Sequence, residues 1–239
     1  MKLLTTGNPK TVKGLAKGFL SFILHLAPAR LSGYNMCPMA SVGCTLGCLN
    51  TSGRGGFDPR IPKARIRKTV QFMEQRIAFM EQLVKDIRSG IRSADRKGLT
   101  PVFRLNGTSD VRWEIIPVVV DGVLYPNLMS AFPAVQFYDY TKIPNRKDIP
   151  ANYHLTFSRS ETNESLIPTV PYNSAVVFST RKGDRLPTTY MGMKVVDGDD
   201  TDLRFLDKTG VVVGLRAKGR AKKDTSGFVV KVRRPRKTK

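Results

Sequence analysis

A long amphipathic helix is the clearest element in the hydrophobic pattern of the chain. Apolar residues recur at alternating steps of four and three, in the order Ile66, Val70, Met73, Ile77, Met80, Val84, Ile87 and Ile91. This spacing places them on one face of a helix that packs into the core. Pro62 suits its first turn, and the basic residues and glycine at 96–98 predict its end.

Short apolar runs that predict buried strands follow this helix. Their ranges are 100–107, 134–141, 153–160, 174–180, 193–198, 210–217 and 227–232. Near-continuous apolar strands that alternate with helical segments are typical of a parallel α/β sheet. The connections shorten after residue 150, which disfavours a closed, regular barrel. We therefore predict one α/β domain over 1–230, a partial or open (β/α) barrel with mostly parallel strands, and a basic tail over 231–239.

The charge of the chain predicts its class of partner. Forty Lys and Arg residues against nineteen Asp and Glu give a net charge of +21 over 239 residues. Such an excess indicates a polyanion, and nucleic acid or a nucleotide is the expected one. The apolar run 15–28 is too short to span a membrane, so we expect no membrane partner and a cytoplasmic protein. The oligomeric state is not readable from the sequence.

The basic segment 214–227 is the predicted nucleic-acid surface. Two glycines lie among its cations, so backbone N–H groups can assist the side chains in holding phosphates. The residues are Arg216, Lys218, Arg220, Lys222 and Lys223. A solvated basic surface without a partner is the alternative.

All three cysteines lie within twelve positions of a glycine-rich loop, 35–57, and they are Cys37, Cys44 and Cys48. Thiolates bind soft or borderline metals, and glycine tolerates the tight turns that wrap a cluster. Three thiolates leave one iron of a [4Fe–4S] cluster open to a small molecule. Alternatively they bind zinc with His25 or His154 as the fourth ligand. A third interpretation makes them small core residues without a metal.

Polar residues follow four of the predicted strands, at 104–110, 137–142, 156–164 and 195–200. Ligands of parallel α/β folds bind beyond the carboxyl ends of the strands, so we expect a shared polar rim. Without a metal, Asp110, Glu161 or Asp197 are the candidate acid–base groups. The acidic run 197–202 lacks the calcium-loop pattern and predicts a solvated or substrate-facing loop. Tyr138, Tyr140 and Phe157 are expected in the core, with base stacking as the alternative.

Several motifs along the chain resemble a family of uncharacterised phage-encoded proteins. They are GNPKTVKG, CPMASVGCTLGCLNTSGRGG, RLNGTSD, QFYDYTK, HLTFSRSETNE and GVVVGLRAKGRAKKDTSGFVV, and they cover about residues 5–230. The resemblance implies a phage protein in the cytoplasm of a bacterial host, and it implies no established activity.

A remoter similarity is to the radical S-adenosylmethionine (SAM) superfamily, which carries three clustered cysteines after the first strand of a partial barrel. This resemblance implies a [4Fe–4S] cluster on the three cysteines, SAM as a second cofactor and an electron donor as a partner. The implied SAM contacts are Asn106, Gly107, Thr108, Ser109, Asp110, Ser158, Arg159 and Glu161. The usual cysteine spacing of that superfamily is C-x3-C-x2-C, whereas this loop has C-x6-C-x3-C.

Two functions are therefore expected. The first is an iron–sulfur, radical-SAM-like phage enzyme that acts on nucleic acid or nucleotides. The second is a zinc-stabilised, non-catalytic phage protein that binds nucleic acid. They differ in the metal and in whether the polar strand ends hold a cofactor.

Overall fold

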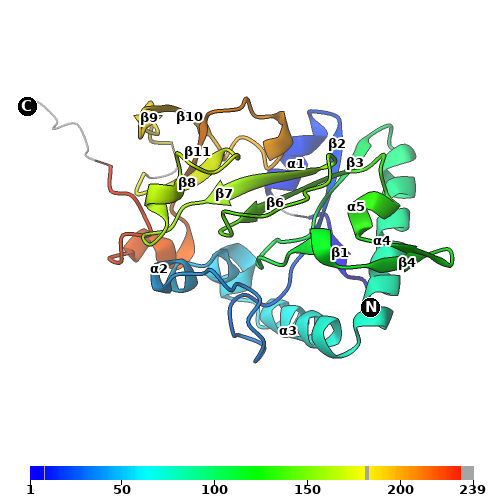
Figure 1. Ribbon diagram of the computed structural model, residues 1–239. Helices are drawn as coiled ribbons and strands as arrows, with labels where there is room; N and C mark the ends of the chain where they lie inside the picture. Colours follow the sequence, from blue (N-terminus) through cyan, green and yellow to red (C-terminus); the bar gives the residue numbers. More distant parts are fainter. Residues whose placement is uncertain (8, 181–182, 233–239) are drawn as a thin grey trace, which may run out of the picture.

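A large, mostly parallel sheet forms the centre of the computed structural model, which describes residues 1–7, 9–180 and 183–232 (Figure 1). In these residues the sheet has nine strands in the order β1-β2-β3-β6-β7-β8-β11-β10-β9. The strands are β1 (Leu4–Thr5), β2 (Phe19–Leu24), β3 (Thr100–Arg104), β6 (Gln136–Thr141), β7 (Tyr153–Ser158), β8 (Ser174–Phe178), β9 (Thr189–Tyr190), β10 (Met193–Asp197) and β11 (Val212–Arg216). A separate hairpin is made by β4 (Val118–Val120) and β5 (Val123–Tyr125).

The strands from β2 through β10 pair in parallel, and the edge strands β1 and β9 pair antiparallel. Because β1 and β9 are the two ends of the strand order, the sheet is open. An α/β fold with a mostly parallel, unclosed sheet is thereby confirmed. The predicted strand over 227–232 is wrong, since only a single bridge joins Val230 to Phe178 there. The predicted basic tail lies, from residue 233 on, outside the described residues.

Five α-helices and six short 3-10 turns connect the strands within the described residues. The helices are α1 (Pro9–Leu15), α2 (Val42–Leu46), α3 (Arg60–Glu74), α4 (Arg76–Asp95) and α5 (Leu128–Ala131). The 3-10 turns are η1 (Leu49–Thr51), η2 (Gly53–Gly56), η3 (Trp113–Ile115), η4 (Glu164–Leu166), η5 (Arg204–Leu206) and η6 (Gly219–Lys223). Among the described residues, no helix combines the length and the apolar character that crossing a membrane requires.

The predicted long helix is two helices, because Gln75 leaves the helical region with φ −130° and ψ 52°. This break shifts the phase of the buried face. Phe72 and Phe79 pack together inside, with ring centroids 5.2 Å apart, whereas Ile77 is 79% exposed. The predicted apolar face is confirmed at Met80, Val84 and Ile87 and is wrong at Met73 and Ile77.

The main core lies between α4 and the first strands of the sheet. Phe22 on β2 stacks on Phe103 of β3 with ring centroids 5.1 Å apart, and α4 packs against both strands. Tyr138 and Phe157 are fully buried, which confirms the expectation that these two rings belong to the core. This packing fixes the strands, and the loops after their carboxyl ends are therefore held in one place.

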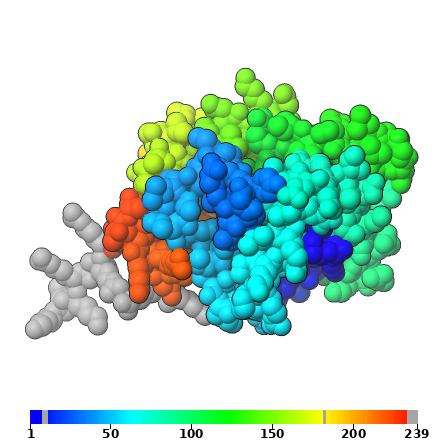
Figure 2. Space-filling model, turned by 90° about the horizontal axis from the view of Figure 1, so that it is seen from below, coloured from blue at the N-terminus to red at the C-terminus, as the bar shows by residue number. Residues whose placement is uncertain are grey.

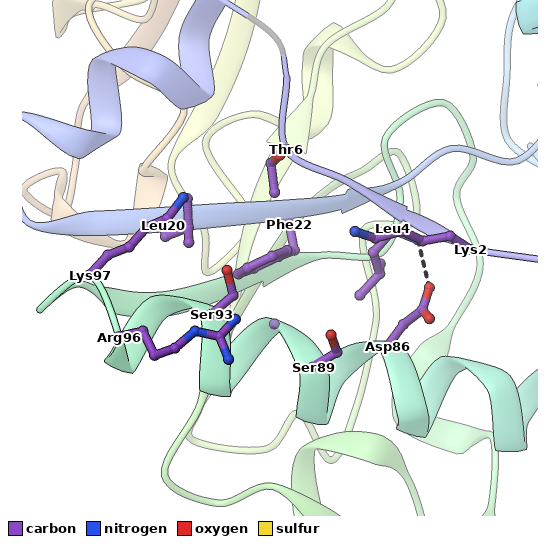
Figure 3. A pocket seen from close by; sticks show the side chains of 11 residues that line it. Lys2, Leu4, Thr6, Leu20, Phe22, Asp86, Ser89, Ser93, Arg96 and Lys97 are labelled. Atoms are coloured by element: carbon purple, nitrogen blue, oxygen red, sulfur yellow. Dashed lines mark hydrogen bonds between the residues drawn. The ribbon is translucent and has the colours of Figure 1, made fainter.

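A pocket lies between β1, β2 and α4, with Phe22 in its lining and Lys2, Arg96 and Lys97 around it (Figure 3). Asp86 of α4 lies at its base and accepts a hydrogen bond from the Leu4 backbone N–H at 3.1 Å, which ties β1 to the helix. None of the predicted site residues lines this pocket.

Candidate metal centre

The cysteine loop joins β2 to α3 and is held by its own short-range hydrogen bonds. Ser41 caps α2, and its Oγ accepts from the Cys44 backbone N–H at 3.1 Å. The Cys48 Sγ accepts from the Asn50 N–H at 3.4 Å and so caps η1. The Cys37 Sγ donates to the Thr108 carbonyl at 3.7 Å, which connects the loop to the segment after β3.

The three thiols lie within electrostatic reach of one another. Burial is the main cause that raises the pKa of Cys37 to about 12, with smaller contributions from the charges of Cys48, Asp110 and Cys44. Burial also raises the pKa of Cys48, with a further contribution from Cys44. The pKa of Cys44 is raised by burial and lowered by the neighbouring Lys142 ammonium. The thiols are therefore protonated at neutral pH unless a cation stabilises their thiolate forms.

The chemistry of these donors suits a soft metal or an iron–sulfur cluster. Within residues 1–7, 9–180 and 183–232, no group of three His, Cys, Asp or Glu side chains is arranged as a finished metal site. Ligation therefore requires the three half-buried thiols to turn toward one point. All three thiols belong to one loop.

The two histidines that were considered as zinc ligands lie in different places relative to the thiols. His154 is on β7, four residues before Ser158, so at about 3.3 Å per residue it lies about 13 Å from the carboxyl end of that strand. His25 follows β2, where burial, followed by the charges of Arg65 and Arg104, lowers its pKa to about 3. His154 is thus remote from the cysteine loop, whereas the His25 ring lies against Gly107, next to the Thr108 carbonyl that Cys37 contacts.

The end of the described chain packs directly on the cysteine loop. A Cβ atom at Gly43 would lie 2.1 Å from Ser226 Oγ and 2.7 Å from Phe228 Cβ. Figure 1 shows α2 beside this C-terminal segment, drawn in orange to red. Gly47 is also close, since its Cβ would lie 3.3 Å from that of Ala221. The glycines of the loop therefore permit close contact with the segment that covers it.

Glu161, a predicted ligand contact after β7, also holds the loop. Its carboxylate accepts from Ser41 Oγ and from the Gly43 backbone N–H, both at 2.8 Å. Arg159 ties β7 to the C-terminal segment by donating to the Phe228 carbonyl at 2.9 Å, and its Nε donates to Glu164 at 2.7 Å. Both side chains thus position the loop and its cover.

Lys142 is the main residue of this site that the candidate residues omitted. It is the first residue after β6, and its Nζ donates to the Ser158 Oγ at 2.7 Å and to the Ser158 carbonyl at 3.1 Å. The ammonium also interacts with Cys44 and lies 5.5 Å from the centre of the Phe228 ring. The sequence could have indicated this residue, because Lys142 is the last residue of the polar run 137–142 that follows a predicted strand.

The predicted residues after β3 mostly organise their own loop. The Asn106 Oδ1 accepts from Ser109 Oγ and the Val111 N–H, each at 2.9 Å. Thr108 Oγ1 donates to the Leu26 carbonyl at 2.6 Å. A Cβ at Gly107 would lie 2.7 Å from the His25 ring, so only glycine fits between the two strand ends.

Asp110 connects this loop to β6. Its Oδ2 accepts from the Lys142 backbone N–H at 2.8 Å, and its Oδ1 lies 4.0 Å from an Arg146 nitrogen. Burial raises the pKa of Asp110, and the hydrogen bond from Lys142 acts in the opposite direction. Asp110, Lys142 and Ser158 therefore form a polar group beside Cys44.

The predicted nucleic-acid residues fall into two groups. Arg216 contacts Asp197 at 2.8 Å, and Lys218 contacts Asp199 at 2.6 Å, so the acidic run neutralises both cations. The other three lie exposed on η6 without an ion pair among the described residues, and they are Arg220, Lys222 and Lys223. The η6 turn packs on η1, which places these cations beside the cysteine loop.

A buried carboxylate behind the site predicts a pH dependence. Burial raises the pKa of Asp139 to about 7, and the side chain accepts from Tyr153 Oη at 2.8 Å. Between about pH 4 and pH 7 the folded chain keeps a proton that the unfolded chain releases. The contribution of this group to the free energy of unfolding therefore decreases as the pH rises through that window.

Comparing the wild type with Asp139→Asn in urea unfolding between about pH 4.5 and 7.5 checks this. The wild type is expected to lose a few kcal/mol relative to the variant, since each pKa unit corresponds to about 1.4 kcal/mol. Asp95→Asn, at an exposed position, is the control. Parallel stability curves for wild type and Asp139→Asn would contradict the prediction.

Fold and site together define an α/β protein with a three-cysteine loop at the carboxyl edge of a parallel sheet. The chain belongs to the family described as Gene product 88, whose model matches residues 2–232. The expected membership in a phage protein family is thereby confirmed. No curated protein and no solved structure matches the chain.

Proposed function

We propose that the protein is an iron–sulfur protein of radical-SAM-like type that acts on nucleic acid or a nucleotide in the host cytoplasm. Its ligands for a [4Fe–4S] cluster are Cys37, Cys44 and Cys48. The supporting observation is that these three thiols lie near one another on one loop at the carboxyl ends of parallel strands. Ligands of open α/β sheets bind at that edge.

The residues around the thiols favour a cluster over zinc. A structural zinc needs four ligands, and His154 lies toward the opposite end of its strand. His25 lies nearer, but the positive charges of Arg65, Arg104 and Lys68 that act on it oppose a divalent cation there. A cluster held by three thiolates needs no fourth protein ligand and, when bound, supplies one-electron chemistry with one iron open to a small molecule. The Lys142 ammonium beside Cys44 stabilises the thiolate form that ligation requires.

The polar group beside Cys44 suits the amino-acid part of SAM. Lys142 provides a cation for its carboxylate, and Asp110 provides an acceptor for its amino group. Glu161 and Arg159 support the site indirectly, since their side chains hold the loop and the segment that covers it. In this proposal the protein's own residues orient the cofactor and keep water from it.

The test is the iron content of the protein purified and reconstituted without oxygen. The wild type is expected to hold about four irons per chain and to absorb broadly in the visible range. Each variant Cys37→Ala, Cys44→Ala and Cys48→Ala is expected to lose most of this iron, because two thiolates hold a cluster poorly. Val42→Ala, an exposed change in the same helix, is the matched control.

One zinc per chain in place of iron would move the conclusion to the zinc-stabilised binding protein. A chain that holds no metal after reconstitution, or that holds iron independently of the cysteines, would refute the proposal.

The nucleic-acid part of the proposal rests on η6. Substituting Arg220, Lys222 and Lys223 by alanine is expected to weaken binding to a single-stranded oligonucleotide and to reduce its salt dependence. If each cation contacts one phosphate, the slope of log K against log salt falls by about 2, since each contact contributes about 0.7. Fluorescence anisotropy across a salt series measures this slope.

The control is a triple alanine variant with the same loss of charge at exposed positions elsewhere, Lys85, Arg92 and Lys194. An equal change in slope for both triple variants would mean that binding follows total charge alone and would contradict a site on η6.

A further inference from the structure

The cysteine loop and the segment just before it expose six large apolar side chains, and their side is called the outer face of the loop here. Their exposed fractions range from 47% to 78%. The residues are Leu31, Met39, Val42, Leu46, Leu49 and Phe57. Val42 and Leu46 lie one helical turn apart on α2, on either side of Cys44 in the sequence. Large apolar side chains exposed along one short segment are typical of an interaction surface.

Cations surround this apolar face. Between residues 30 and 57 the chain has Arg30 and Arg54 and no acidic residue. On one side, η6 adds Arg220, Lys222 and Lys223, because it packs on η1. Figure 2 shows the loop in blue on one face of the molecule, between α3 in cyan and the C-terminal segment in orange to red. The face thus has an apolar centre and a basic rim.

The charge and the side-chain types select the occupant. A second copy of the chain would bring a net charge of +21 against a basic face, which opposes self-association. Nucleic acid binds exposed apolar surface mainly by stacking bases on aromatic rings, and five of the six side chains are aliphatic. An acidic protein with an apolar contact area matches both features.

We propose that an acidic electron-carrier protein docks on this outer face of the cysteine loop. Val42, Leu46 and Leu49 form the apolar centre of the contact, and the surrounding cations steer the acidic partner onto it. The electron-carrier role rests on the proposed function, since the loop beneath holds the ligands of the proposed cluster. One electron passes from the reduced carrier to the oxidised cluster, so the carrier is oxidised and the cluster reduced by one unit.

The experiment uses a small acidic [2Fe–2S] ferredoxin, labelled with a fluorophore, as the probe for binding to the full-length chain. The wild type is expected to bind it saturably, and binding is expected to weaken between roughly 50 and 500 mM salt. The triple serine variant of Val42, Leu46 and Leu49 is expected to raise the dissociation constant by about tenfold or more. Thermal unfolding establishes that each variant is folded.

The matched control replaces three exposed apolar residues of the β4–β5 hairpin by serine, and they are Val119, Val123 and Leu124. This control is expected to leave the affinity unchanged. Equal weakening by both triple variants, or no saturable binding of the ferredoxin, would overturn the proposal. A single-stranded oligonucleotide, or a second copy of the chain, that binds in place of the ferredoxin and is lost in the loop variant would also overturn it.

The iron content of the chain distinguishes a failure of the docking proposal from a failure of the proposed cluster. Binding is measured after reconstitution with iron, and the iron content of the same sample is determined. A chain that docks the ferredoxin but takes up no iron would support the surface and refute its electron-carrier role. With iron present, reduced ferredoxin is expected to bleach the wild-type cluster faster than that of the loop variant, whereas dithionite reduces both alike. Equal rates with ferredoxin would count against docking at this face.

Discussion

Replacing Arg146 by alanine is expected to destabilise the protein by about 3–5 kcal/mol, because it leaves a buried carboxylate without its main counter-charge. The side chains of Arg146 and Glu114 are both fully buried, and the Arg146 Nε donates to Glu114 at 3.0 Å. Arg146 also lies 3.3 Å from Tyr153 Oη and 4.0 Å from Asp110. Its loss therefore affects the core and the polar strand ends together.

Urea unfolding measures this effect, and the chain offers a matched pair at its surface. The side chains of Arg88 and Asp121 are 40% and 71% exposed, so Arg88→Ala is expected to cost less than about 1 kcal/mol. Replacing both Arg146 and Glu114 by methionine is expected to restore part of the loss, since Glu114 no longer remains as an unpaired buried charge, while Asp110 still loses the nearby charge of Arg146. Similar losses for Arg146→Ala and Arg88→Ala would contradict this account.

Substituting Gly43 by alanine is expected to force the C-terminal segment away from the cysteine loop. The added Cβ would lie 2.1 Å from Ser226 Oγ and 2.7 Å from Phe228 Cβ, and the second atom is next to the backbone. Ser226 cannot turn away freely, because its Oγ donates to Asp224 at 2.6 Å. Overpacking of this kind typically costs about 1–3 kcal/mol.

Two further glycines make the Gly43 prediction a graded series. Gly47→Ala is expected to have a smaller effect, since its nearest contacts would be 3.2–3.3 Å, and Gly7→Ala meets no atom within 4 Å. Thermal unfolding and the rate of thiol alkylation are expected to follow the order Gly43, Gly47, Gly7, because displacement of the cover exposes Cys44. Equal alkylation rates for Gly43→Ala and Gly7→Ala would refute the role of the close contact.

Much of the sheet was predictable because buried parallel strands have a simple hydrophobic signal. Six of the seven predicted strand ranges contain an observed strand. The exception is 227–232, which is apolar because it covers the cysteine loop. Its first residue, Gly227, has a φ of +93°, which is outside the strand region. An apolar run in the sequence predicts that a segment is buried, but it does not tell whether the segment is a strand or a cover packed on a loop.

The long helix illustrates a second limit. The steps of three and four continue through residues 66–91, yet the helix breaks at Gln75, and Phe72 and Phe79 on either side of the break pack together inside. The periodic pattern predicts the buried face of each helix separately. Which aromatic rings of the two helices pack together depends on the sheet beneath them.

The candidate site was predictable as a location and less so as a set of roles. The polar strand ends at 104–110, 137–142 and 156–164 do meet the cysteine loop. The sequence did not indicate that Asn106 and Arg159 would use their side chains on neighbouring backbone, or that Arg216 would pair with Asp197. Such partners depend on which loops the fold brings together.

The C-terminal segment that covers the cysteine loop is synthesised much later than the loop itself. Synthesis proceeds at about 5–20 residues per second, so Ser226 and Phe228 leave the ribosome on the order of ten seconds or more after Gly43. During that interval the thiols belong to a nascent chain whose site is still open to solutes. The order of synthesis thus gives a metal or a preformed cluster direct access before the last segment closes over its ligands.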